Sequence, residues 1–243
     1  FLNTEFATKV FEIMQTRDHM TVFIDNIRLY KRQIESVKPE DERYVNALMA
    51  RSDLLDLCGN FPQMKFIIFT NLEDTPIDDF ILDRIPENVA CISAVNAITH
   101  NDKVIPAPYG VQRKMTADDD RIEQLTEWME FDYKDNPDKL LYVSHNESSN
   151  AKRQGIKNLF YDKDWAEVNE QRVGYHTFLS NLSNSKFMIC PEGNAIDCHR
   201  NWEVLYMRRV PIMTRDPYLQ VLFKNYPVLF VDKYSDITEE LLL

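Results

Sequence analysis

The sequence is poor in glycine and cysteine, and these shortages exclude several common kinds of site. Its 243 residues include only five glycines, and no two lie close enough to form a G-x-G-x-x-G loop, a P-loop or a G-x-S-x-G turn. The four cysteines include no C-x-x-C pair, which argues against a zinc ribbon or a thioredoxin motif. Such sparse cysteines slightly favour a reducing cytoplasm, and a lumenal domain trimmed from a secretory-pathway protein stays open.

Basic charge and long apolar runs are scarce as well. The chain carries 28 Lys and Arg against 39 Asp and Glu, a net charge of −11. A protein this acidic is a poor general binder of nucleic acid, so no nucleic-acid partner is expected. No apolar run approaches the ~20 residues of a membrane helix, so no membrane span is expected either.

Short apolar runs alternate with helix-like segments along the whole chain. Strands are expected at residues 21–24, 66–69, 89–95, 140–144, 186–190, 210–213 and 228–231, and a strand followed by a turn is expected at residues 104–110. Helices are expected at residues 9–16, 42–57, 118–130, 165–182, 196–208 and 219–223, and from residues 76 and 238 onward. This alternation predicts an α/β class with parallel sheets and ligands at the carboxyl ends of the strands. The break at residues 135–138 predicts two domains, 1–135 and 136–243.

The densest polar cluster follows the expected strand at residues 186–190. It reads Pro191-Glu-Gly-Asn-Ala-Ile-Asp-Cys-His-Arg-Asn-Trp-Glu203, a loop that leads into a helix. Loop amides and a helix N-terminus form an anion site in such a geometry. Arg200 and Glu203 share nearly one helix face, so an arginine for phosphate and a glutamate for ribose hydroxyls are one interpretation. A surface Arg–Glu pair is the alternative.

Two further clusters follow expected strands. Residues 145–153 contain asparagines, serines and two cations after the strand at 140–144, which suits a diphosphate or a capped helix start with solvated cations. In the first half, Glu73 and Asp74 follow the strand at 66–69. They are candidates for a general base, and Asp74 is equally suited to capping a helix entered at Pro76.

The segment from Ser185 to Tyr206, followed by Val210-Pro-Ile-Met, resembles the donor-binding motif of exostosin-like glycosyltransferases. The shared pattern is a strand, proline-x-glycine-asparagine, aspartate-x-histidine-arginine and x-tryptophan-glutamate. The segment from Asn146 to Arg153 also looks like the asparagine-rich strand end of that family. The resemblance covers roughly residues 64–243.

This resemblance implies a GT-B-like fold: two small Rossmann-like domains whose parallel sheets face a central cleft. The N-terminal domain would bind the acceptor, and the C-terminal domain would bind a nucleotide sugar. The donor-binding residues would be Asn146, Asn150, Arg153, Pro191, Gly193, Asn194, Asp197, His199, Arg200 and Glu203. The catalytic base would be Asp74 or Glu73, with Asp74 preferred because the family landmark ends in aspartate. Acceptor-side residues would be Asn71, Asn96 and Gly110.

Three departures from the family pattern leave details open. Ile196 replaces a small residue, and Tyr206-Met-Arg-Arg209 replaces leucine-x-glycine, so the donor sugar is undecided. The segment from Thr70 to Asp74 carries one extra residue, so the base is undecided. Asp118-Asp-Asp120 contains a D-x-D triplet but is expected to open a surface helix. No metal is therefore expected, since arginines and helix amides can supply the positive charge.

The sequence thus predicts an inverting, metal-independent glycosyltransferase without a cofactor. The co-substrate would be a nucleoside-diphosphate sugar, with UDP as the favoured nucleotide and a pentose such as xylose among the candidate sugars. The acceptor would be a glycan hydroxyl. Two alternatives stay open: a nucleotide- or glycan-binding module without turnover, and another two-domain α/β enzyme of sugar nucleotides such as an epimerase.

Overall fold

The computed structural model describes residues 19–24, 59, 62–63, 65–70, 77, 82–83, 85–98, 101–112 and 120–243. The chain divides into two compact units, Phe1–Ala107 and Pro108–Leu243. The boundary expected after residue 135 falls inside the second unit, because residues 108–110 and the helix at Arg121–Phe131 contact later C-terminal elements. The described residues form two sheets of parallel strands, which confirms the expected α/β class.

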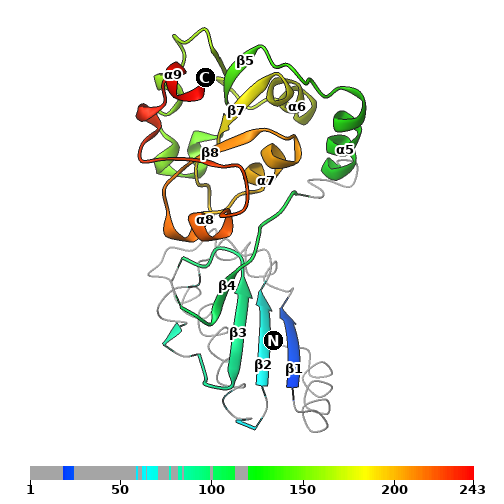
Figure 1. The fold of residues 1–243 in the computed structure, drawn as a ribbon, viewed down its shortest axis with the longest axis vertical. Coiled ribbons are helices and arrows are strands. Elements are labelled where there is room, and N and C mark those ends of the chain that lie inside the picture. Colours follow the sequence, from blue (N-terminus) through cyan, green and yellow to red (C-terminus); the bar gives the residue numbers. More distant parts are fainter. Residues whose placement is uncertain are drawn as a thin grey trace. The chain divides into compact units, whose positions relative to one another are not determined.

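The first unit contains a four-stranded parallel sheet. Its strands are β1 (His19–Ile24), β2 (Lys65–Thr70), β3 (Val89–Ala94) and β4 (Val104–Pro106), in the order β1-β2-β3-β4. They lie side by side in Figure 1. Phe66 and Ile68 of β2 are buried whereas Ile67 is 38% exposed, so alternate residues of the strand face the core.

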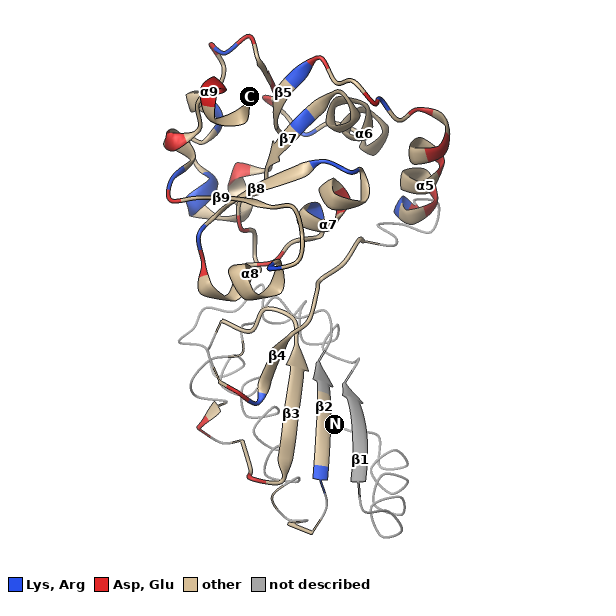
Figure 2. Ribbon diagram, viewed as in Figure 1, with Lys and Arg blue, Asp and Glu red and all other residues tan. Residues whose placement is uncertain are grey.

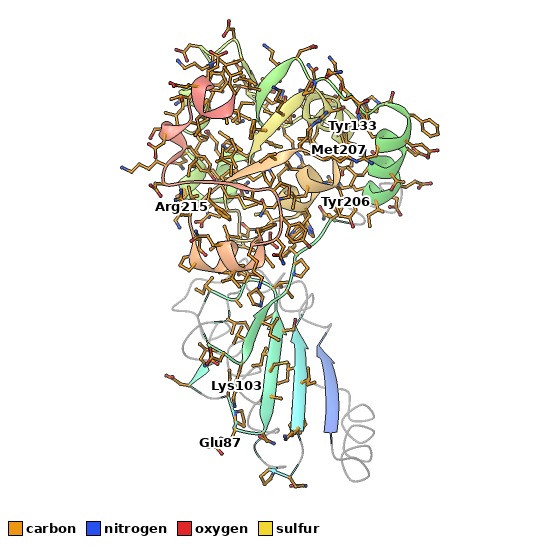
Figure 3. All side chains as sticks on the ribbon, in the orientation of Figure 1. Glu87, Lys103, Tyr133, Tyr206, Met207 and Arg215 are labelled. Atoms are coloured by element: carbon orange, nitrogen blue, oxygen red, sulfur yellow. The ribbon has the colours of Figure 1, made fainter. Side chains whose placement is uncertain are left out.

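Lys103 fixes the entry into β4. Its Nζ donates to the carbonyls of Pro86 (3.1 Å) and Glu87 (3.3 Å), in the turn that leads into β3. Figure 3 labels Lys103 and Glu87 at this end of the sheet. The lysine therefore ties the starts of two neighbouring parallel strands together.

The second unit alternates strands and helices around a five-stranded sheet. Its longer elements are α5 (Arg121–Phe131), β5 (Lys139–Val143), β6 (Ala166–Val168), α6 (Tyr175–Ser183), β7 (Ser185–Ile189), α7 (His199–Tyr206), β8 (Val210–Thr214), α8 (Pro217–Leu222), β9 (Leu229–Val231) and α9 (Glu239–Leu242). Single 3₁₀ turns are η1 (Glu147–Ser149), η2 (Ala151–Arg153), η3 (Lys157–Leu159) and η4 (Tyr234–Asp236). Asp120 caps α5, as the run of aspartates predicts, by accepting from the amide of Glu123 (3.3 Å).

The order of the strands, β6-β5-β7-β8-β9, fixes where a ligand is expected. All neighbours are parallel, and β5 pairs with β6 on one side and β7 on the other. The chain therefore reverses its direction of travel across the sheet between β5 and β7 (Figure 1). In open parallel sheets, ligands bind at such a switch point, beyond the carboxyl ends of the strands.

Two expectations about the second unit need correction. Residues 165–182 are not mostly helical: Ala166–Val168 form the edge strand β6, and α6 starts only after Gly174. A strand of only three residues contains no apolar run from which it could be predicted. The helix expected at 196–208 is shorter, His199–Tyr206, because Cys198 is its N-cap and Arg208 takes a positive φ of 52°.

Several sequence predictions lie outside the described residues. They are the helices at residues 9–16 and 42–57 and the helix start at Pro76. Within the described part of the chain, Cys91, Cys190 and Cys198 are free thiols. No helix among the described residues is both long and apolar enough to cross a membrane.

Opposite the carboxyl ends of the strands, Arg209 joins three elements at the start of β8. Its Nη1 donates to the Tyr133 hydroxyl (2.7 Å), and its Nη2 donates to the Ser183 (2.6 Å) and Lys134 carbonyls. The Tyr133 ring also lies 4.5 Å from the Arg209 guanidinium carbon, and Figure 3 labels Tyr133 in the second unit. These contacts connect the end of α6 and the segment after α5 to the sheet.

Candidate functional site

Arg153 clamps together the two loops that follow β5 and β7. Its Nε donates to the Glu192 carbonyl (2.7 Å), and its Nη2 donates to the Pro191 carbonyl (2.9 Å) and contacts Cys198 Sγ (3.9 Å). Its Nη1 donates to Ser149 Oγ (2.8 Å) and the Asn146 carbonyl (3.3 Å). A guanidinium has five N–H donors, and protein acceptors engage all of them. We call Arg153 and these five acceptors the loop clamp.

Gly193 is required by this clamp. A Cβ on Gly193 would lie 2.9 Å from Arg153 Nη2 and 3.2 Å from Cys198 Sγ. The guanidinium cannot retreat without breaking its bonds to the loop carbonyls. The missing side chain at Gly193 is therefore explained by the close approach of an arginine, whereas the resemblance explains it by the approach of a donor.

Asn146 and Asn150 act as local caps. Asn146 Oδ1 accepts from the Ser148 amide (3.1 Å) and Asn150 Oδ1 accepts from the Lys152 amide (2.9 Å). Asn150 Nδ2 also donates to the Gly193 carbonyl (2.7 Å), which adds a second link between the two loops. The capped start that was the alternative interpretation of residues 145–153 is thus present. Of the two cations in this segment, only Lys152 is exposed to solvent.

Asp197 is completely buried and holds the start of α7 in place. Its carboxylate accepts from Trp202 Nε1 (2.8 Å), Asn201 Nδ2 (2.9 Å) and the amide of Tyr109 (2.8 Å). Burial raises the pKa of Asp197, and these hydrogen bonds oppose that shift. Both carboxylate oxygens of Asp197 accept hydrogen bonds from protein donors. Asp197 therefore joins the segment before α5 to α7 rather than facing a ligand.

His199 and Gly110 form a second link to the same segment. His199 Nδ1 lies 2.6 Å from the Gly110 carbonyl, and its ring meets the Tyr109 ring edge-on at 4.5 Å. A carbonyl can only accept, so Nδ1 carries the proton of this bond. Gly110 takes a φ of 70° and is part of the second unit. It therefore lies beside His199, one of the predicted donor-binding residues.

Arg200 and Glu203 do not form the exposed pair that was the alternative interpretation. Glu203 is only 2% exposed, and its Oε2 lies 3.5 Å from Arg200 Nε. Arg200 Nη1 donates to the Ser144 carbonyl at the carboxyl end of β5 (2.5 Å), and its guanidinium carbon lies 4.3 Å from the Phe178 ring centre. The arginine side chain is still 33% exposed, so it can meet a ligand at the switch point.

Around Glu203, the structure leaves buried polar atoms unpaired. Within the described residues, Glu203 Oε1, Arg200 Nε and the Tyr175 hydroxyl each have no hydrogen-bond partner. An unpaired buried polar atom costs about 1–3 kcal/mol, so three of them around one carboxylate mark a place that a polar ligand or water would satisfy. This group contains the candidate binding atoms of the site.

His145, directly beyond β5, is a buried histidine. Its Nε2 lies 3.2 Å from the Arg153 carbonyl and so carries the proton, whereas Nδ1 is buried without a partner among the described residues. Burial lowers the pKa of His145 to about 4, and the charges of Arg153 and Lys157 contribute to that shift. The ring is therefore neutral at pH 7.

The predicted donor residues gather on the two loops and on α7. Asn146, Asn150, Arg153, Pro191, Gly193, Asp197 and His199 form contacts within the protein, and Asn194 is exposed. Arg200 and Glu203 alone among the ten combine a place at the switch point with an unpaired buried atom. Their assignment as ligand residues stays a prediction.

The first-half candidates are only partly described. Asn71, Glu73, Asp74, Asp118 and Asp119 lie outside the described residues. Asn96 is buried and follows β3 with a φ of 54°, a left-handed conformation that asparagine tolerates. Its carbonyl accepts from the amide of Ile77 (3.1 Å), so it shapes the turn after β3.

Sequence reasoning missed Arg121 and Tyr175. Arg121 begins α5, where Figure 2 shows a basic segment followed by acidic ones, and its Nη1 lies 3.8 Å from Glu203 Oε1. Tyr175 begins α6. The two residues are separated from Glu203 by 82 and 28 positions respectively (203 − 121 and 203 − 175), so no local spacing reveals the grouping.

No family model matches this sequence, and no match was found among the curated proteins. In the part of the chain that the structure describes, no group of three or more His, Cys, Asp or Glu side chains is arranged to hold a metal ion. Activity without a metal remains a prediction to be tested.

Proposed function

We propose that the second unit binds a nucleoside-diphosphate sugar at the switch point of its sheet, and that the chain is an inverting glycosyltransferase of the GT-B type. The observation that carries the proposal is the Glu203 carboxylate. It is buried, it lies between Arg121 and Arg200, and its Oε1 has no hydrogen-bond partner among the described residues. A ribose supplies two neighbouring hydroxyl donors.

The cations suit the diphosphate. Arg200 reaches the end of β5 with a side chain that is 33% exposed, and Lys152 lies on the loop after β5. Lys152 is 74% exposed and pairs with Glu192 at 2.6 Å. An exposed pair of this kind contributes little stability, so the lysine can exchange its partner for a phosphate. The N-terminus of α7, at the end of the loop after β7, adds a partial positive charge.

The reaction would displace the diphosphate directly. The acceptor hydroxyl gives its proton to a carboxylate base as its oxygen bonds to the anomeric carbon, and the bond from that carbon to the diphosphate oxygen breaks. Positive groups placed where the leaving charge develops supply electrostatic stabilisation. Asp74 is the preferred base and Glu73 the second candidate, on the strength of the family resemblance.

A nucleotide-binding module without turnover is the second candidate, and one observation favours it. The guanidinium of Arg153, which the resemblance assigns to the diphosphate, is engaged by five protein acceptors. Fewer cations are then left to stabilise a leaving group. The two candidates differ in whether a bound nucleotide sugar is consumed.

The test is a binding screen followed by a turnover assay. Thermal shift with UDP, GDP and ADP identifies the nucleotide, because a ligand at a hundred times its Kd stabilises by about 2.7 kcal/mol. Sugars of that nucleotide, xylose included, are then incubated with glycan acceptors, with and without EDTA. A new β- or α-linkage opposite to that of the donor supports the proposal. Binding without any product supports the module, and the absence of binding contradicts both.

The base is tested with a matched pair of variants. Asp74→Asn is expected to lower turnover by about 10²- to 10⁴-fold with nucleotide affinity unchanged, because only proton removal is lost. Asp78→Asn, four residues further on, serves as the control and should keep its turnover. If Asp74→Asn keeps its rate and loses about 1 kcal/mol of stability, the residue is a helix cap instead.

A further inference from the structure

Three helices of the second unit contribute to the surroundings of Glu203. Arg121 comes from α5, Tyr175 and Phe178 from α6, and Arg200 and Glu203 from α7. We call these five residues the helix cluster. Sequence motifs account for the two members on α7, whereas the proposed function assigns no role to Arg121, Tyr175 or Phe178.

The ring of Tyr175 is held firmly, whereas its hydroxyl, which faces the Glu203 carboxylate, has no close hydrogen-bond partner among the described residues. Its ring stacks on Phe178 with centres 5.7 Å apart and planes 20° from parallel. The Arg121 guanidinium carbon lies over the Tyr175 ring, 4.6 Å from its centre. Such stacking and cation–π contacts fix the orientation of the ring without using its hydroxyl.

Arg200 and Arg121 compensate the charge of Glu203 without forming short hydrogen bonds to its carboxylate oxygens. Their nitrogens lie 3.5 Å and 3.8 Å from the carboxylate oxygens, beyond the 2.7–2.9 Å that is usual for a charge-assisted bond. Burial and the neighbouring Glu203 carboxylate raise the pKa of Tyr175, so the phenol stays protonated at neutral pH. The cluster therefore presents an acceptor, Glu203, and a donor, Tyr175, in a place largely shielded from water.

We propose that Tyr175 recognises the ribose of the bound nucleotide together with Glu203. This inference rests on the proposed nucleotide-binding function. The carboxylate accepts a hydrogen bond from the ribose 2′,3′-diol, and the Tyr175 hydroxyl donates one to an oxygen of that diol. A ligand without the diol leaves both buried groups unpaired, and sites built in this way reject such analogues strongly. The site is thus selective for ribonucleotides.

The test compares a nucleoside diphosphate with its 2′,3′-dideoxy analogue by calorimetric titration. The probe is UDP with dideoxy-UDP, or GDP with dideoxy-GDP if the guanine nucleotide binds more tightly. The variants are Tyr175→Phe and Glu203→Gln, and Tyr226→Phe is the control for the same chemical change at a half-exposed ring packed on Trp202. Thermal unfolding without ligand is measured for each protein.

We expect the wild-type protein to bind the ribonucleotide at least 10-fold more tightly than the dideoxy analogue. Tyr175→Phe should weaken the binding of the ribonucleotide about 5-fold and leave the affinity for the analogue unchanged. Glu203→Gln should weaken the binding of the ribonucleotide more. The unliganded Tyr175→Phe protein should melt no earlier than wild type, because the lost hydroxyl has no close hydrogen-bond partner among the described residues. Tyr226→Phe should change neither ligand's affinity.

Three results overturn the inference. If the wild-type protein binds the ribonucleotide but Tyr175→Phe weakens both ligands equally or neither, Tyr175 does not read the diol and the nucleotide-binding function stands. If Tyr175→Phe melts earlier with unchanged affinities, the hydroxyl holds an ordered water in a structural role. If the wild-type protein binds no nucleoside diphosphate, the proposed function fails and the inference fails with it.

Discussion

The loop clamp and the helix cluster treat their polar atoms in opposite ways. In the loop clamp, Arg153 donates to acceptors on both loops and Gly193 leaves room for its guanidinium. In the helix cluster, Glu203 and Tyr175 are buried or held by ring contacts, yet each has an unpaired oxygen among the described residues. We interpret the paired groups of the loop clamp as structural and the unpaired buried groups of the helix cluster as candidate ligand contacts. The resemblance alone does not separate the two kinds.

The largest effect is expected from breaking the loop clamp. Arg153→Met should lower the free energy of unfolding by about 2–4 kcal/mol, because several part-buried acceptors lose a charged donor together. Lys152→Met is the control next to it and should cost less than about 1 kcal/mol, since its ion pair with Glu192 is exposed. Chemical denaturation measures both. A stable Arg153→Met protein with lost nucleotide affinity would make Arg153 a ligand residue.

His145 is the exception within the loop after β5, because its Nδ1 is unpaired. Its pKa is lowered to about 4 in the folded protein, from an ordinary value near 6.5, so the unfolded chain binds one more proton between these pH values. Stability is therefore lost as the pH falls through 6.5 toward 4. The loss attributable to His145 between pH 7 and pH 5 should be about 1–2 kcal/mol.

The check is the same denaturation experiment at the two pH values with His145→Gln, which can still form hydrogen bonds but does not titrate. The variant should lose about 1–2 kcal/mol less than the wild-type protein on acidification. Equal pH dependence of the two proteins would mean that the pKa of His145 is the same in the folded and unfolded states, so that it is charged in the folded protein at pH 5. It would then have to be reconsidered as a charged group facing a ligand.

The smallest effect concerns strain outside both regions. Arg208 follows α7 with a φ of 52°, at the position where the exostosin-like pattern carries glycine. Arg208→Gly should stabilise the protein by about 1 kcal/mol, because glycine adopts this left-handed conformation without a steric penalty. Arg208→Ala should give no such gain and is the matched control. A loss of stability on Arg208→Gly would show that the contact of Arg208 with the Tyr133 ring outweighs the strain.

Much of the fold follows from local pattern. Compact apolar runs predicted the strands β2, β3, β5, β7, β8 and β9, and the aspartates before Arg121 predicted the start of α5. Local pattern failed for β6, because Ala166-Glu-Val168 becomes a strand only by pairing with the edge of β5. It also overextended α7 at both ends.

The candidate site could be predicted only as a location. Sequence placed polar clusters after β5 and β7, and the strand order brings these two loops to one switch point. It could not separate Arg153, which is bonded within the protein, from Arg200, which keeps an exposed part. That difference depends on tertiary contacts with residues about forty positions away (192 − 153 and 191 − 153), and the same holds for the burial of Glu203 beside Arg121.

The most direct test of the central claim is a paired measurement on Glu203→Gln: nucleotide affinity by calorimetry and free energy of unfolding by denaturation. Removing the charge that receives ribose hydroxyls should weaken the nucleoside diphosphate by about 1.5–3 kcal/mol, roughly 10- to 150-fold. The unliganded stability should fall as well, because Arg200 and Arg121 lose the buried charge that compensates their own. An unchanged affinity in a folded Glu203→Gln protein would contradict the account.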